Sequence, residues 1–244
     1  MKKTIFLAAM LLSVVSTSFA DEPYWAMNIA AGFDFFGTTP HEMDNIRAYR
    51  SSNQYLYGSH DKMAVSYYFS FMPEYYLLNQ ISVSTGLRLT NTKSKYESDY
   101  DYFYYKIKED GYNTYYQKVR SFSQTSTYVG IPLEFRFTIR GNGRPTPYIR
   151  GGMVFNFHLT TATKTNLYRD DPGGDPVSLP DADKFVLPIY AAVGCQVGHK
   201  KSVSLEFTFP YILPGCSMSG FQECDDLGGG FRLTYQFAKN KIKE

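Results

Sequence analysis

The chain has 244 residues, of which 43% are hydrophobic, 17% aromatic and 20% charged. This composition excludes a disordered chain and a bundle of membrane-spanning helices. The 25 basic and 23 acidic residues leave a formal charge of only +2. That balance is unlike a nucleic-acid-binding surface, so we predict no nucleic-acid partner.

The first twenty residues have the pattern of a secretory signal peptide. Lys2 and Lys3 form a basic start, residues 5–15 are mainly apolar, and Ser18 and Ala20 are the small residues expected before a cleavage site. We therefore predict a signal peptide over residues 1–20 and cleavage near Ala20. The remaining 224 residues have no net formal charge, and their number fits one domain, residues 21–244.

Beyond Ala20 the dominant pattern is alternation of apolar and polar residues, which is typical of strands. The clearest example alternates Ile131, Leu133 and Phe135 with Glu134 and Arg136. The predicted strands lie within residues Trp25–Phe35, Ala64–Glu74, Ile81–Thr92, Tyr128–Ile139, Ile149–Leu159, Phe185–Val197, Val203–Phe209 and Phe231–Phe237.

The connections between these segments alternate between short and long. Eight strands with this alternation are typical of a small outer-membrane barrel, in which short turns face the periplasm and long loops face outward. We therefore predict an all-β fold, an eight-stranded antiparallel up-and-down transmembrane β-barrel. A soluble β-sandwich with the same alternation is the competing fold. The short connections are 78–80, 141–146 and 198–201, and the long ones are 37–62, 93–121, 161–184 and 212–226.

The charged residues on the polar strand faces sum to zero, and none of them is lysine. Side chains fill the interior of an eight-stranded barrel, so charges that point inward would be dehydrated and would need partners. Arginine suits such pairing better than lysine because its planar group binds carboxylates in two places. We predict a charge network in the lumen made of Asp34, Glu74, Arg88, Glu134, Arg136, Arg150, Glu206 and Arg232.

Aromatic residues gather near both ends of the predicted strands, as in the aromatic girdles of membrane barrels. Tyr75, Tyr76 and Tyr148 lie near the short turns, whereas Phe35 and Phe36 lie near the long connections. We predict two aromatic belts that contain these residues.

Tyr128-Val129-Gly130-Ile131-Pro132-Leu133-Glu134-Phe135-Arg136-Phe137, a turn, and Pro147-Tyr148-Ile149-Arg150-Gly151-Gly152 resemble the central hairpin of the PorT-like outer-membrane β-barrel domain family. The resemblance covers the chain after the signal peptide in strand order. It implies a small barrel of the outer-membrane class with a signal peptide, in the cell outer membrane of a Gram-negative-type bacterium. It supplies no catalytic motif.

The second long connection is rich in tyrosine and contains a natural turn at Glu109-Asp110-Gly111. Tyrosine presents contact area at a low entropy cost. One interpretation is a protruding hairpin that contacts a partner, and the alternative is a set of rings that pack over the barrel mouth. The candidate contact residues are Tyr100, Tyr102, Tyr104, Tyr112 and Tyr115.

Three further sites have weaker patterns. His158 lies on a predicted strand, facing the lumen near its outer end, where a lipid deacylase or acyltransferase barrel would need a catalytic histidine. No serine or carboxylate has a spacing that marks it as the partner. Cys216 and Cys224 share one long connection and are predicted to form a disulfide. Asp170, Asp171 and Asp175 surround a Pro-Gly-Gly turn, and we predict no metal site there and no cofactor.

These features favour a non-enzymatic outer-membrane barrel with a side-chain-filled lumen. It would act through its long outer loops as a surface interaction, adhesion or assembly component. The expected partners are outer-membrane lipids and an extracellular or envelope protein. The alternative is a lipid-modifying barrel enzyme that uses His158.

Overall fold

A computed structural model describes residues 24–40, 46–47, 49–51, 54–56, 63–78, 80–97, 102–110, 113–139, 145–168, 179, 181–198, 201–213, 216–220, 222–223 and 227–241. The expected signal peptide, residues 1–20, and the Asp170–Asp175 turn lie outside these ranges. Within them the regular structure is entirely β, and no helix is long and apolar enough to cross a membrane. The predicted all-β, antiparallel architecture is therefore confirmed.

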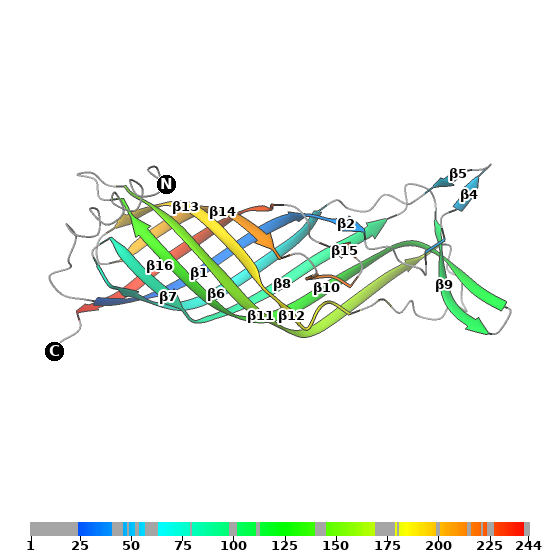
Figure 1. Cartoon of the computed structure of the whole chain (residues 1–244), viewed down its shortest axis with the longest axis horizontal. Helices are drawn as coiled ribbons and strands as arrows, with labels where there is room; N and C mark the ends of the chain where they lie inside the picture. Colours follow the sequence, from blue (N-terminus) through cyan, green and yellow to red (C-terminus); the bar gives the residue numbers. More distant parts are fainter. Residues whose placement is uncertain are drawn as a thin grey trace, which may run out of the picture.

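The main sheet closes on itself (Figure 1). Among the described residues, antiparallel pairings link the strands in chain order and then return from β16 to β1. We call this closed part the ring. Its eight positions are occupied by β1 (Tyr24–Gly37), β6 (Met63–Tyr76), β7 (Ile81–Thr85) with β8 (Leu87–Glu97), β10 (Asn113–Thr138), β11 (Thr146–Leu167), β13 (Pro188–Gly198), β14 (Ser202–Ile212) and β16 (Gly229–Lys241).

Glycine shapes the ring at two points. Gly86 separates β7 from β8 with a φ of 153°, and a Cβ there would lie 2.1 Å from the carbonyl oxygen of Phe71. Gly198 has a φ of 116° at the end of β13, where the chain turns back into β14. Both conformations favour glycine because it lacks a Cβ.

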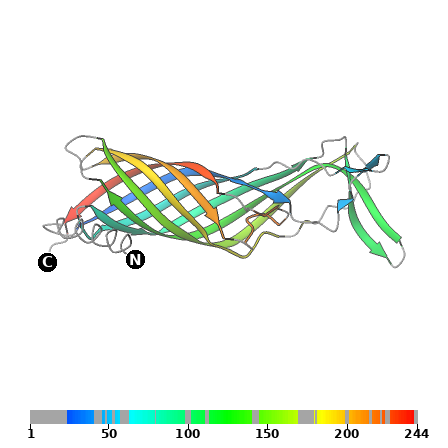
Figure 2. The same cartoon turned by 45° about the horizontal axis from the view of Figure 1, so that its top comes forward.

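Short strands lie at the end of the ring opposite the start of β1 and the end of β16 (Figures 1 and 2). β9 (Phe103–Asp110) forms a hairpin with the start of β10, and β3 (Ile46–Arg47) pairs with β9. β12 (Phe185–Val186) pairs with β11, β2 (Thr39–Pro40) with β15 (Gln222–Glu223), and β4 (Tyr49–Ser51) with β5 (Gln54–Leu56).

Three strands are longer than the alternation predicted. β8 continues to Glu97, β10 begins at Asn113, and β11 continues to Leu167, so residues expected in long connections are paired strand. The apolar period disappears there because the outward side chains become polar. We call residues 91–97 of β8, 113–127 of β10 and 160–167 of β11 the extension. Above residues 63–65 of β6 its described strands form an open sheet in the order β8, β10, β11.

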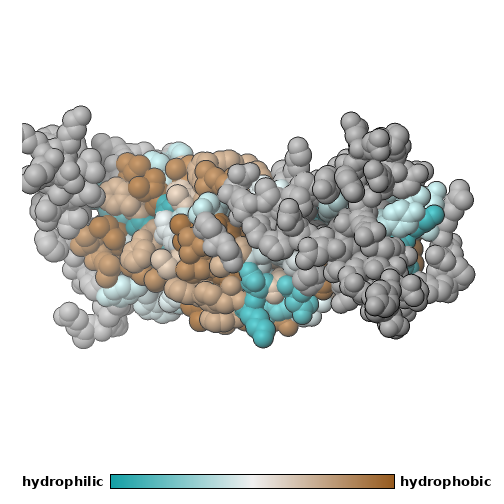
Figure 3. Space-filling model, turned by 45° about the vertical axis from the view of Figure 1, so that its right-hand side comes forward, coloured by the Kyte–Doolittle hydropathy of each residue, from teal (hydrophilic) through white to brown (hydrophobic). Residues whose placement is uncertain are grey.

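Below the extension, the two faces of the ring are chemically opposite. The outward face carries large apolar side chains that remain exposed, as the brown surface in Figure 3 shows. Sheet faces in water are normally covered or polar, so this surface requires an explanation. We call it the apolar belt; its members include Tyr67, Phe69, Phe71, Leu87, Leu89, Ile131, Phe135, Ile149, Phe157, Ile189, Val193, Val203, Leu205, Phe231 and Leu233.

Candidate functional site

The ring interior is polar and charged. All eight charged residues predicted to face the lumen lie on the inward face of the ring, and each is at most 7% exposed. They come from seven of the eight ring positions, because the side-chain alternation of each strand directs them inward.

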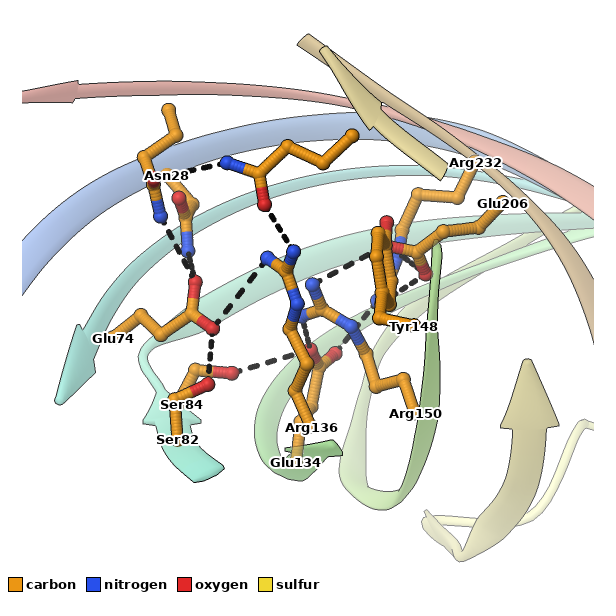
Figure 4. A network of polar contacts seen from close by, with 12 residues as sticks. Asn28, Glu74, Ser82, Ser84, Glu134, Arg136, Tyr148, Arg150, Glu206 and Arg232 are labelled. Atoms are coloured by element: carbon orange, nitrogen blue, oxygen red, sulfur yellow. Dashed lines mark hydrogen bonds and ion pairs between the residues drawn. The ribbon is translucent and has the colours of Figure 1, made fainter. Parts of the chain in front are cut away.

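Four of these side chains form a closed set of ion pairs at the centre of the ring (Figure 4). Arg150 contacts Glu134 at 2.6 Å and Glu206 at 3.2 Å. Arg232 contacts the same two carboxylates, at 2.7 Å and 2.5 Å. Each arginine therefore bridges both glutamates. We call these four residues the charge square.

Two tyrosines add hydrogen bonds to the charge square. The Tyr148 hydroxyl donates to Glu206 Oε1 at 2.6 Å, and the Tyr190 hydroxyl donates to Glu134 Oε1. Both rings are buried. These hydroxyls help to satisfy carboxylate oxygens that water cannot reach.

A second group surrounds Glu74 near the short-turn end. Its carboxylate accepts hydrogen bonds from Asn28 Nδ2 (2.7 Å), Ser82 Oγ (2.5 Å) and Gln236 Nε2 (3.2 Å). Arg136 lies 3.8 Å from Glu74 and stacks over the Tyr148 ring at 3.8 Å. Tyr148 links this group to the charge square, because its ring contacts Arg136 and its hydroxyl donates to Glu206.

The remaining two charges have contacts other than an ion pair in the described part of the chain. Asp34 accepts a hydrogen bond of 2.7 Å from Thr208 Oγ1. The Arg88 guanidinium lies over the Tyr68 ring at 3.9 Å, a cation–π contact. Dehydrated charges were expected to have partners. For these two residues the partners are a hydroxyl and an aromatic ring, which a count of charges alone does not reveal.

Several aromatic residues predicted for the outer belts point inward instead. Tyr76 and Tyr148 are 5% and 1% exposed, and Phe36 is 2% exposed. Successive strand residues alternate between faces, so in the pairs Phe35-Phe36 and Tyr75-Tyr76 only the first ring points outward. The belt prediction was wrong for these three residues.

Two connections close the long-loop end of the ring. Met218 and Cys216 follow β14, while Ala182 and Val186 lead into β13, and they pack with Phe36, Ala64, Tyr128 and Ile212 in one apolar cluster. Asp183 N donates to Ser217 O (3.1 Å), and Ser217 N donates to Asp183 Oδ2 (2.5 Å), so the two connections hold each other. We call residues 181–186 and 216–220 the plug.

Polar contacts attach the plug to the inward face of the extension. Gln124 Oε1 accepts hydrogen bonds from Gly220 N (2.7 Å) and Ser219 Oγ (3.2 Å). Ser94 Oγ donates to Ser219 Oγ at 2.8 Å, and Thr92 Oγ1 donates to the Met218 sulfur at 3.7 Å. The sequence had no signal for this plug, because residues 216–220 lie in a Gly- and Pro-containing connection without a period.

The structure contains the tyrosine-rich hairpin and describes the contacts of some of its residues. The Tyr102 ring packs on Tyr104 (5.5 Å) and Tyr168 (4.7 Å), with Lys118 Nζ 4.7 Å from its centre. Tyr100 and Tyr112 lie outside the described residues, as does the side chain of Tyr115. An apolar cluster of Tyr96, Tyr105, Val119, Phe122 and Leu179 underlies the hairpin.

His158 is half-buried at the plug end of the ring. Its Nε2 hydrogen-bonds Thr161 Oγ1 at 2.6 Å, and its ring packs edge-on against Tyr128. The Thr161 hydroxyl is a possible nucleophile in chemical type, but no described contact of His158 supplies the serine or the carboxylate that the enzyme alternative called for.

Cys216 is a free cysteine among the described residues, and Cys224 lies outside them, so the predicted disulfide stays a prediction. The Cys216 side chain packs against the apolar cluster of the plug, where cysteine acts as a small hydrophobe. Cys195 is also free. No group of three or more His, Cys, Asp or Glu side chains among the described residues could hold a metal ion.

No protein-family model and no curated protein matches this chain. Among solved structures, the translocator domain of the autotransporter NalP from Neisseria meningitidis is similar at 8% identity and a TM-score of 0.22, over 97% of this chain and 95% of that chain. A similarity of this size assigns neither fold nor function.

Proposed function

We propose that this chain is an outer-membrane β-barrel protein with a closed interior, and that it acts through a contact surface held above the membrane. The observation that carries the first part is the pairing of an exposed apolar belt with a buried charge square in the same strands. Phe135 is 55% exposed, whereas its neighbour Glu134 is fully buried. In water this arrangement would expose the apolar residues, and in a bilayer both faces have suitable surroundings.

The interior supports a structural role rather than conduction. A ring of eight strands is just wide enough for its own side chains to fill it. Here the charge square occupies its centre and the plug occupies one end. Two obstacles in series argue against an open pore.

The extension supports a role in binding a partner. From Thr160 to Leu167, β11 pairs with β10 on one side, and in the described part of the chain it has no strand on the other. An unpaired edge can accept an extended segment of another protein through backbone hydrogen bonds. We infer that this edge and the tyrosine hairpin form the contact surface.

Membership of the PorT-like family and secretion through the signal peptide belong to the same proposal. The proposed orientation in the membrane has the extension and plug facing outward and the short turns facing the periplasm, as in small outer-membrane barrels.

Heat-modifiable migration tests the barrel. The mature chain, folded in detergent and left unheated, should migrate faster in gel electrophoresis than the boiled sample, and should remain in the membrane after carbonate washing. Identical migration with release into the wash would contradict the proposal.

Photo-crosslinking in intact cells tests the contact surface. A photoreactive residue at Thr163, on the open edge, should give a discrete product of higher mass with a protein partner. The same residue at Leu205, in the apolar belt, is the control and should give no such product. Equal patterns from both positions would contradict the role of the edge.

A further inference from the structure

The outward face of the extension changes from apolar to basic within a few residues. Register defines rows across three strands, and the last apolar row consists of Leu89, Val129 and Phe157. Above it, in order, lie Asn91, Thr127 and Thr160; then Lys93, Thr125 and Ala162; then Lys95, Ser123 and Lys164.

Three lysines are therefore close neighbours on one face. Lys95 and Lys164 flank Ser123, and adjacent strands are about 4.8 Å apart, so these two lysines start roughly 10 Å from each other. Lys93 lies two residues from Lys95 on β8, at about 7 Å. Lys93 and Lys164 are exposed, and the hydroxyls of Ser123 and Thr125 lie between the lysine-bearing strands.

The acidic residue on this face does not cancel the charge. Glu97 pairs with Lys95, and the hydrogen bond from Lys95 lowers the pKa of the Glu97 carboxyl. Lys93 and Lys164 remain as the excess charge of the described residues in these rows.

These rows lie just above the level of a lipid headgroup layer, so their lysine side chains would reach down to it. Two residues of a tilted strand rise about 5 Å along the ring axis, so the Lys93 row lies roughly 10 Å, and the Lys95 and Lys164 row roughly 15 Å, above the last apolar row. Headgroup regions add about 5 to 8 Å to each side of the hydrocarbon core, and lysine side chains extend toward such interfaces.

The basic face is confined to one sector of the ring. Across the ring, the described outward residues at this end of β12 and β14, and just before β16, are Phe185, Tyr211 and Leu227. Lys184, just before β12, is a single exposed lysine, so among the described residues at this end an annular lipid would meet neighbouring lysines only beside the extension.

We propose that Lys93 and Lys164, on either side of the Lys95–Glu97 pair, form a binding site for the phosphate of an anionic membrane-lipid headgroup. The lysine ammonium groups contact the phosphate, Ser123 and Thr125 add hydroxyl donors, and the apolar row beneath contacts the acyl chains. This site rests on the proposed insertion of the ring in a membrane.

Native mass spectrometry of the folded mature protein, released from detergent after incubation with phosphatidic acid or phosphatidylcholine, tests the site. The wild type should retain phosphatidic acid in preference. Each lysine near a headgroup layer contributes an attraction of several-fold, so the double variant K93Q/K164Q should bind phosphatidic acid roughly tenfold more weakly. The variant K201Q/K241Q removes the same charge at the short-turn end of the ring and should bind like the wild type.

Loss of retention in K201Q/K241Q equal to that in K93Q/K164Q, or no loss in either, overturns the site. Inorganic phosphate at millimolar concentration should not displace the lipid; displacement would show a site for free phosphate and overturn the headgroup assignment. A protein that enters bilayers but binds both lipids equally refutes only this site, whereas failure to enter bilayers refutes the proposed function.

Discussion

The ring and the extension are built from the same strands but are opposite in design. In the ring, β10 directs Glu134 inward and Phe135 outward, so charge is enclosed and apolar surface is exposed. In the extension, the same strand directs Phe122 inward and Ser123 outward, as a protein in water does. The reversal is what we expect if the ring lies in lipid, as proposed, and the extension lies in water.

The two regions also differ in closure. The ring has no open edge among its described pairings, whereas the extension ends at β11 on one side. Closure satisfies the backbone where no water is available, and an open edge is tolerable only where water or a partner can complete it.

The largest expected effect is on the charge square. Arg232→Ala leaves buried carboxylates with fewer partners and should lower the free energy of unfolding in detergent by about 3–5 kcal/mol. Lys164→Ala, in the extension, is the control and should change it little. The double variant Arg232→Met/Glu206→Leu should lose less stability than Arg232→Ala, because both charges are then removed together. Equal effects of Arg232→Ala and Lys164→Ala would remove the distinction between the regions.

The next effect concerns the outward faces. Phe135→Arg places a charge on the proposed lipid-facing surface and should cost about 2–4 kcal/mol when the chain folds into vesicles. Ala162→Arg places the same side chain on the outward face of the extension and should fold with wild-type yield. If both variants fold equally well, the apolar belt does not contact lipid.

A smaller effect is expected from the tyrosine hydroxyls. Tyr148→Phe removes one hydrogen bond to Glu206 and should lower the free energy of unfolding by about 1 kcal/mol. Tyr67→Phe, on the outward face of β6 where the side chain is 58% exposed, should leave it unchanged. A loss from Tyr67→Phe as large as that from Tyr148→Phe would show that the interior hydroxyl has no special role.

The smallest expected effect on the ring comes from removing the hairpin. Glu97 and Ser121 are register partners, so residues 98–120 can be replaced by Asn-Gly, a two-residue turn. The ring should keep its heat-modifiable migration and its unfolding midpoint, while the Thr163 crosslink to a partner weakens. A ring that no longer folds would show that the two regions are not separable.

The inward and outward faces of the ring could be predicted from the sequence. Neighbouring residues such as Glu134 and Phe135 differ sharply in polarity, so each face of a strand has one chemical character. The extension could not be delimited, because polar residues on both faces, as in residues 160–166, leave no contrast. Met218 and Ser219 of the plug depend on contacts with distant strands. Tyr148, Tyr76 and Phe36 could be placed inside from the sequence, because each lies two residues from a predicted lumen charge, Arg150, Glu74 and Asp34.

Nitroxide labels placed one at a time along the outward face of β10, at Ser123, Thr125, Thr127, Val129, Ile131 and Phe135, test the account most directly. In vesicles, collisions with oxygen should be favoured from Val129 onward, and collisions with a water-soluble nickel complex should be favoured up to Thr127. Uniform access of the nickel complex to Ile131 and Phe135 would contradict a lipid-facing belt.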